Sequence, residues 1–159
     1  MKFFDGEYHS TLDKQGRFVM PVGIKKQLPD EVCVFAVARG KDKCIYLYPV
    51  DAWEKQKEKL AAVNTNDDMG RAYVMLSLRG SQIVSTDNTS RFPLPKQLVE
   101  YAGLEKDIVI HAELEKFVIY SKDYFDKFFE FKTMDELKKH MGGDVLNELG
   151  KYVNQTFGL

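Results

Sequence analysis

The chain has 159 residues, of which 44% are hydrophobic, 13% aromatic and 30% charged, so it can bury a core and is not a disordered chain. Its formal net charge of −1 argues against a histone-like protein with a general basic surface, but it does not exclude a local basic patch. No apolar run could span a bilayer and two cysteines cannot form a disulfide framework, so we expect a soluble, intracellular protein.

The first part of the chain predicts short strands around a polar turn. Tyr8 to Leu12 alternates apolar with polar residues, and Phe18 resumes an apolar run after the polar segment Asp13 to Arg17. A strand, a turn that contains glycine and a second strand together favour a β-hairpin. Two later runs, Val32 to Ala38 and Cys44 to Tyr48, are rich in β-branched and aromatic residues and predict two more strands.

Two helices are predicted in the middle of the chain. One begins near Pro49 and carries Trp53. A second is predicted because four apolar residues recur at the spacing of one helix face: Met69, Ala72, Tyr73 and Leu76. Asn66 or Asp67 can cap the start of this connecting helix, and Gly80 can end it. We expect the helix to pack on both flanking parts of the chain and to fix their relative positions.

The second half of the chain repeats the first. Asp13 to Pro21 and Asp87 to Pro95 share the pattern D-x-x-x-R-F-x-(M/L)-P. Tyr48 to Lys55 resembles Tyr120 to Lys127 at an offset two residues smaller, and we place this loss in the loop around Gly40. A duplicated unit of about 45 residues is too small to bury a sufficient core. We therefore expect the strands of the two copies to interdigitate, and a small barrel is one arrangement in which they could bury a shared core.

The second copy and the tail complete the predicted elements. Strands and then a helix are expected at Ile83 to Asp87, Phe92 to Leu94, Ile108 to Leu114, Phe117 to Tyr120 and Lys122 to about Phe131. Thr133 to Glu136 has a capping-box pattern, so a further helix should follow, bent at Gly142 and Gly143. The phenylalanines between positions 125 and 131 are either core residues or part of a subunit interface.

The repeated Asp-x-x-x-Arg pattern allows two interpretations. In the structural one, Asp13 begins a turn, Gly16 supplies a positive φ, and an exposed pair with Arg17 adds only about 0–1 kcal/mol of stability. In the functional one, Asp13 braces Arg17 so that its guanidinium faces a phosphate or a guanine edge. The local charge supports the second interpretation, because four cations oppose one carboxylate between positions 9 and 28: Lys14, Arg17, Lys25 and Lys26.

These residues carry a resemblance to a known family. Glu7 to Arg17, followed by Pro21, closely resembles the opening motif of MraZ proteins, which look like tandem, degenerate relatives of the AbrB swapped-hairpin DNA-binding domain. The likeness covers roughly residues 1–127 and extends to several later segments, namely Arg39 to Gly40, Cys44 to Pro49, Trp53 to Lys55, Arg71 to Gly80 and Asp87 to Pro95.

The resemblance implies an α+β fold of two tandem AbrB-like units, which form a small pseudo-symmetric β-barrel with flanking helices. The first AbrB-like domain would cover residues 5–52 and the second residues 81–124, and a helical tail would occupy residues 125–159. Carried over by position, the expected DNA contacts are Asp13, Lys14, Arg17, Asp87 and Arg91. We add Lys25 and Lys26 on charge alone.

The resemblance also implies a function. We expect a sequence-specific transcriptional regulator, a repressor, of the division and cell-wall gene cluster that includes its own gene. It would bind short direct repeats in the promoter of its operon as a ring homo-oligomer. It would be cytoplasmic and nucleoid-associated, with no membrane contact and no cofactor.

The second motif departs from the first at two positions. It has Asn88 in place of Lys14, which removes one phosphate contact, and Ser90 in place of Gly16, which removes an inexpensive positive-φ residue. We therefore expect the second copy to hold its arginine differently or to serve mainly as architecture.

Two rival classes of function remain. An enzyme is disfavoured because the three histidines are scattered and Cys33 and Cys44 lack the paired spacing of a zinc site. The chain also contains no glycine-rich phosphate loop and no nucleophile elbow. The second rival is a ring scaffold or protein-interaction module that does not bind DNA, and a salt-dependent shift of promoter DNA would separate it from a regulator.

Overall fold

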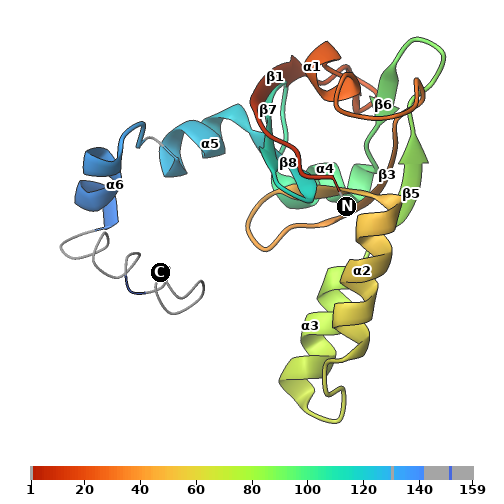
Figure 1. The fold of residues 1–159 in the computed structure, drawn as a ribbon, viewed down its shortest axis with the longest axis vertical. Helices are drawn as coiled ribbons and strands as arrows, with labels where there is room; N and C mark the ends of the chain where they lie inside the picture. The colour runs from red at the N-terminus through yellow and green to blue at the C-terminus, as the bar shows by residue number, and fades with distance from the viewer. Residues whose placement is uncertain (1, 130, 142–150, 152–159) are drawn as a thin grey trace. The chain divides into compact units, whose positions relative to one another are not determined.

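The computed structural model describes residues 2–129, 131–141 and 151, and its chain divides into two compact units, Met1–Tyr124 and Phe125–Leu159. The strands are β1 (Glu7–Thr11), β2 (Arg17–Val19), β3 (Val34–Arg39), β4 (Ile45–Pro49), β5 (Gln82–Ser85), β6 (Arg91–Pro93), β7 (Asp107–Glu113) and β8 (Lys116–Ser121). The helices are α1 (Val22–Lys25), α2 (Val50–Ala61), α3 (Asp68–Leu78), α4 (Lys96–Ala102), α5 (Lys122–Phe128) and α6 (Met134–Met141). The expected α+β class is confirmed (Figure 1).

The strands of the two copies interdigitate, as the repeat predicted. A six-stranded antiparallel sheet has the order β1-β7-β8-β4-β3-β5, and β2 and β6 form a separate two-stranded ribbon. The first strand of each copy pairs with the third strand of the other, β2 pairs with β6, and β4 pairs with β8. Among the residues that the structure describes, no pairing joins β1 to β5 and closes the sheet. The barrel and the AbrB-like arrangement therefore stay predictions.

The predicted hairpin of the first strand and the strand after Arg17 is wrong. β1 pairs with β7 and β2 pairs with β6, so neither uses the other as its ladder partner. The two strands are linked at the base of the turn by a bond from Asp13 N to Arg17 O at 2.8 Å. A local turn signal identifies where the chain reverses, but β1 gains a five-residue ladder only with the other copy.

The core lies between the ribbon and the sheet. Phe18 and Phe92 are directly opposite in the ribbon and are 1% and 0% exposed. The ring of Phe92 lies 5.9 Å from that of Phe35 on β3, and Phe35 lies 5.8 Å from Phe117 on β8. Because alternate residues of a strand point to opposite faces, the inward phenylalanines leave the flanking residues of β2 and β6 on the outer face.

The length difference between the copies falls where the sequence placed it. In the first copy Arg39 pairs with Ile45, so the β3–β4 loop runs over residues 40–44. In the second copy Glu113 pairs with Lys116, which leaves a tight turn of Leu114 and Glu115.

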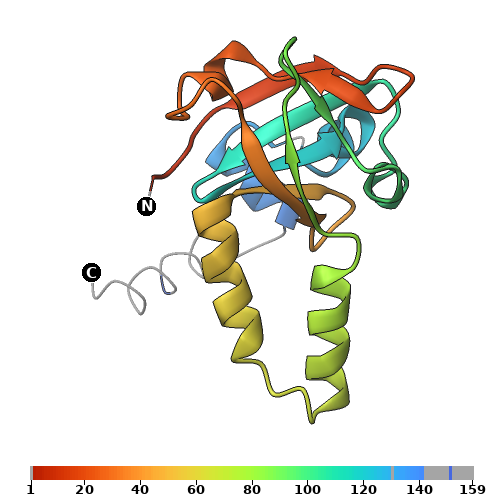
Figure 2. The same cartoon turned by 90° about the vertical axis from the view of Figure 1, so that its right-hand side faces the viewer.

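The connecting helix forms as predicted but does not pack as predicted. Asp67 caps α3 by accepting a bond from Met69 N, and Gly80 follows the helix with a φ of 79°. Figure 2 shows α2 and α3 running side by side, away from the strands. Every residue of α3 is exposed or only partly buried, with Met69 78% and Leu76 57% exposed. Periodicity identifies the apolar face of a helix, but it does not say what covers that face.

Two short helices follow prolines and were not predicted. α1 follows Pro21 and α4 follows Pro95 at the matching place in the second copy. With four and seven residues, they are too short to show a helical period.

The predicted helix at the end of the second copy and the tail helix are both present. The first of these, α5, ends at Phe128 rather than near Phe131. Half of the capping box is present at α6, where Glu136 N donates to Thr133 Oγ1 at 3.1 Å, but the Glu136 carboxylate accepts from Lys132 N rather than from Thr133 N. The predicted bend at Gly142 and Gly143 lies outside the described residues. Within the described part of the chain, no helix is long and apolar enough to cross a membrane.

Candidate nucleic-acid interface

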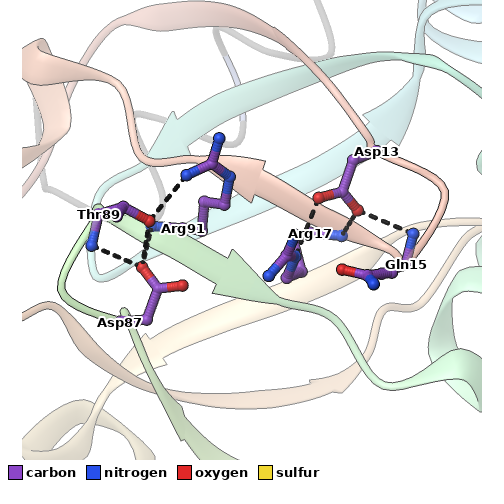
Figure 3. A network of polar contacts seen from close by, with 6 residues as sticks. All are labelled: Asp13, Gln15, Arg17, Asp87, Thr89 and Arg91. Atoms are coloured by element: carbon purple, nitrogen blue, oxygen red, sulfur yellow. Dashed lines mark hydrogen bonds and ion pairs between the residues drawn. The ribbon is translucent and has the colours of Figure 1, made fainter.

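The β2–β6 ribbon brings the arginines of both motifs to one surface. Its register places Arg17 opposite Pro93 and Val19 opposite Arg91, so both arginines share the face opposite the two phenylalanines. Both arginines are partly exposed, and Val19 between them is 52% exposed. Figure 3 shows the two Asp-x-x-x-Arg segments next to each other at this face.

In the first motif, Asp13 fixes both the turn and the guanidinium. Its Oδ1 accepts the backbone N–H groups of Gln15 and Arg17, each at 2.9 Å, and its Oδ2 accepts Arg17 Nε–H at 2.9 Å (Figure 3). The Arg17 N–H is the largest cause that holds the pKa of Asp13 below its ordinary value, so this carboxylate is ionised at neutral pH. Because the ion pair uses Nε, the two terminal nitrogens of Arg17 stay available as donors to a ligand.

The second motif reproduces the turn of the first. Asp87 Oδ1 accepts the N–H groups of Thr89 at 2.8 Å and Arg91 at 3.0 Å, and Ser90 N donates to Asp87 O at 3.1 Å. The corresponding bond from Gly16 N to Asp13 O is also 3.1 Å. Ser90 adopts a φ of 61°, close to the 78° of Gly16. The loss of glycine therefore does not change the form of the turn.

The guanidinium of the second motif is held by a different residue, as the sequence suggested. Arg91 Nη1 donates to Thr89 Oγ1 at 2.8 Å, and the same hydroxyl donates to Asp87 Oδ1 at 2.8 Å (Figure 3). The Thr89 hydroxyl is the largest cause that lowers the pKa of Asp87, and the charge of Arg17 contributes as well. Sequence reasoning missed Thr89, because only the folded turn brings its hydroxyl between the two charged groups.

The three predicted lysines fall in different surroundings. Lys14 is exposed in the first turn, and Lys26 is exposed just after α1. Lys25 is only partly exposed, and its Nζ donates to Ser90 Oγ at 2.7 Å. A concavity of about 620 Å³ next to the second turn is lined by Lys25 and Lys26 and by Asn88 and Ser90, with carboxylates also among its lining residues.

The residues considered for catalysis lie in structural environments. Cys33 and Cys44 are buried, and burial raises the pKa of Cys44 to about 12, so neither thiol is a reactive thiolate. His9 contacts Glu7 at 2.9 Å, and His111 lies 3.7 Å from a carboxylate oxygen of its own strand. No metal-binding group of three or more ligands occurs among the residues that the structure describes.

Comparison with known proteins gives one consistent result. The chain matches the family described as "MraZ protein, putative antitoxin-like" over residues 3–74 and 77–141. It is 31% identical over 147 residues to the transcriptional regulator MraZ of Clostridium botulinum (strain Alaska E43 / Type E3), covering 92% of the chain and 99% of that protein. It is 36% identical over 129 residues to the protein of the same name from Cytophaga hutchinsonii, covering 80% and 85%. The corresponding protein of Natranaerobius thermophilus is 33% identical over 125 residues, covering 79% and 85%.

Proposed function

The chain belongs to the MraZ family, and from this membership we propose that it is a sequence-specific DNA-binding regulator that contacts DNA through the outer face of the β2–β6 ribbon. Its relatives are named transcriptional regulators, which is not an enzyme class.

The observation that carries this proposal is the pair of arginines on one ribbon face. A two-stranded β-ribbon fits the major groove, where an arginine can donate two bonds to a guanine edge. Asp13 holds Arg17 in place and Asp87 holds Arg91 through Thr89, so both guanidiniums are oriented before DNA arrives. In this proposal the aspartates brace the arginines, while Lys14 and Lys26 contact phosphates and add salt-dependent affinity.

The finer parts of the proposal rest on the resemblance. We propose that the protein represses the division and cell-wall gene cluster by binding short direct repeats upstream of its own operon. It acts in the cytoplasm on the nucleoid. The exchange of strands between copies supports two AbrB-like swapped-hairpin domains, at residues 5–52 and 81–124, followed by a C-terminal tail at 125–159.

Self-association into a ring is the last part of the proposal. Its support is the apolar face of α3, whose exposed side chains include Met69, Tyr73 and Leu76. Exposed apolar patches on a folded domain mark interaction surfaces. A ring would place several ribbons on successive repeats, and weak contacts would then add through their effective concentration. The same apolar face would also suit a scaffold without DNA binding, so DNA binding must be tested directly.

The test is a titration of DNA from upstream of the protein's own gene, beside a scrambled sequence, at several salt concentrations. Loss of one bidentate arginine contact costs about 1–3 kcal/mol of discrimination, so we expect Arg17→Ala to weaken specific binding by about 5- to 150-fold for each contact that is lost. The oligomer should stay intact. Arg71→Ala removes the same charge from an exposed position on α3 and should bind as the unmodified protein does.

Two results would contradict the proposal. Unchanged affinity of Arg17→Ala for the promoter would exclude the ribbon as the DNA-reading face. Equal affinity of the unmodified protein for promoter and scrambled DNA would favour the scaffold.

A further inference from the structure

Lys25 reaches from one copy of the repeat to the turn of the other. It lies on α1, in the first copy, and its Nζ donates to Ser90 Oγ at 2.7 Å across 65 positions of sequence. This contact is partly buried. Ser90 is one of two non-glycine residues with positive φ in the described part of the chain, and the other is Leu114 in the β7–β8 turn.

The remaining polar groups of Ser90 are also bonded. Its N–H donates to Asp87 O at 3.1 Å, within its own turn. Its carbonyl accepts from Met20 N at 2.8 Å, so the first copy holds this residue at both the backbone and the side chain. A serine in the left-handed region needs such support, because its Cβ makes that conformation more costly than it is for glycine.

The matching site in the first turn uses different residues. Gly16 takes the place of Ser90, and its carbonyl accepts from Leu94 N at 2.9 Å. Val99 on α4 takes the place of Lys25, since a Cβ added to Gly16 would lie 3.9 Å from its Cγ2. Each turn therefore lies against the short helix of the other copy. A glycine faces a valine in one case, and a serine faces a lysine in the other.

We propose that Lys25 is a positioning residue, which holds Ser90 in its left-handed conformation and thereby fixes the neighbouring Arg91 for DNA. This inference rests on the proposed function and changes the role expected for Lys25, which charge alone marked as a phosphate contact. The hydrogen bond from the Lys25 ammonium offsets the cost of the left-handed conformation at Ser90, which a glycine would adopt without help. Lys26, the next residue, is exposed and keeps the phosphate role.

The two roles predict different responses to salt. A lysine that neutralises a phosphate releases counterions, and its loss lowers the slope of log affinity against log salt by about 0.9. A lysine that acts through Ser90 leaves this slope unchanged. Its loss should also be rescued by Ser90→Gly, because glycine adopts positive φ without help.

The experiment compares four variants of the full chain on promoter DNA: Lys25→Met, Ser90→Gly, the double variant and the control Lys26→Met. We expect Lys25→Met to weaken specific binding about tenfold, the size of one misplaced arginine contact, with an unchanged salt slope. Ser90→Gly and the double variant should bind within about twofold of the unmodified protein, and Lys26→Met should lower the slope by about 0.9. A lowered slope in Lys25→Met without rescue in the double variant would overturn the proposal.

A second measurement does not depend on DNA. Lys25→Met should speed amide hydrogen exchange at Ser90 and Arg91 about tenfold, while Gly16 and Arg17 in the other turn keep their rates. Unchanged exchange at Ser90 would overturn the positioning role, whether or not the protein binds DNA. Faster exchange together with no promoter binding by the unmodified protein would uphold that role and reject the proposed function.

Discussion

Arg17 and Arg91 occupy matching places on the β2–β6 ribbon, but different groups hold their guanidiniums. Arg17 Nε donates directly to the ionised carboxylate of Asp13, and both side chains are 36% exposed. The guanidinium of Arg91 is linked to Asp87 through the neutral hydroxyl of Thr89. The Arg17 bond joins two opposite charges directly, whereas the Arg91 bond has only one charged partner, so Arg17 is the more firmly oriented of the two.

We therefore predict that Arg91→Ala weakens promoter binding less than Arg17→Ala. The two turns have the same backbone hydrogen bonds, so the expected difference comes from how firmly each arginine side chain is held. Both variants should be titrated side by side on the same DNA at one salt concentration. Equal losses of affinity would show that the two arginines contribute alike and would contradict this prediction.

For single residues, the sequence predicts the repeated charged positions but not the contacts that hold their turns in place. The offset between the motifs identifies Asp13, Arg17, Asp87 and Arg91 without any structure. The contact between Lys25 and Ser90 links residues that are distant in sequence, so no local pattern contains it.

The elements show where local patterns suffice and where they do not. The runs at β3, β4, β7 and β8 were predicted to within a few residues, because β-branched and aromatic residues concentrate in them. The pairing partners of β1 and β2 were not predicted, because both partners lie in the other copy.

The α3 helix shows a further limit of local patterns. The partly buried positions of α3 include Gly70, Val74 and Ser77, and a Cβ at Gly70 would lie 2.2 Å from Asn64 O in the connection to α2. The larger apolar residues Tyr73 and Leu76 instead line an open groove of about 510 Å³ together with Trp53.

We predict that Leu76→Glu lowers the mass of the protein in solution. Leu76 is 57% exposed, so a carboxylate there should leave the subunit folded but disfavour burial against a second copy. Met75→Glu is the matched control, because Met75 is 61% exposed on the same helix but lies off the apolar face. Light scattering after size exclusion, over a range of concentrations, measures the effect. An unchanged mass in Leu76→Glu, or an equal fall in both variants, would contradict a role for this face.

At the scale of the whole molecule, the two copies are not independent domains in their strand pairing. Every strand of the first copy has a partner in the second: β1 with β7, β2 with β6, β3 with β5 and β4 with β8. The sequence predicts interdigitation because the repeated unit is too small to fold alone. It does not predict the register, because register depends on which apolar faces meet in the assembled core.

This exchange predicts that the chain can be cut between its copies and reassembled. The connection between α2 and α3 lies at the end of the helical pair, away from the strands (Figure 2), so a break there leaves every cross-copy strand pair available. Fragments 1–65 and 66–159 should each be unfolded at micromolar concentration, because each lacks the partner strands against which its own strands are buried. When mixed they should form a one-to-one complex with native far-ultraviolet circular dichroism and a Tm that rises with concentration. If fragment 1–65 alone melts cooperatively as a monomer, the first copy is an independent domain and strand exchange does not govern folding.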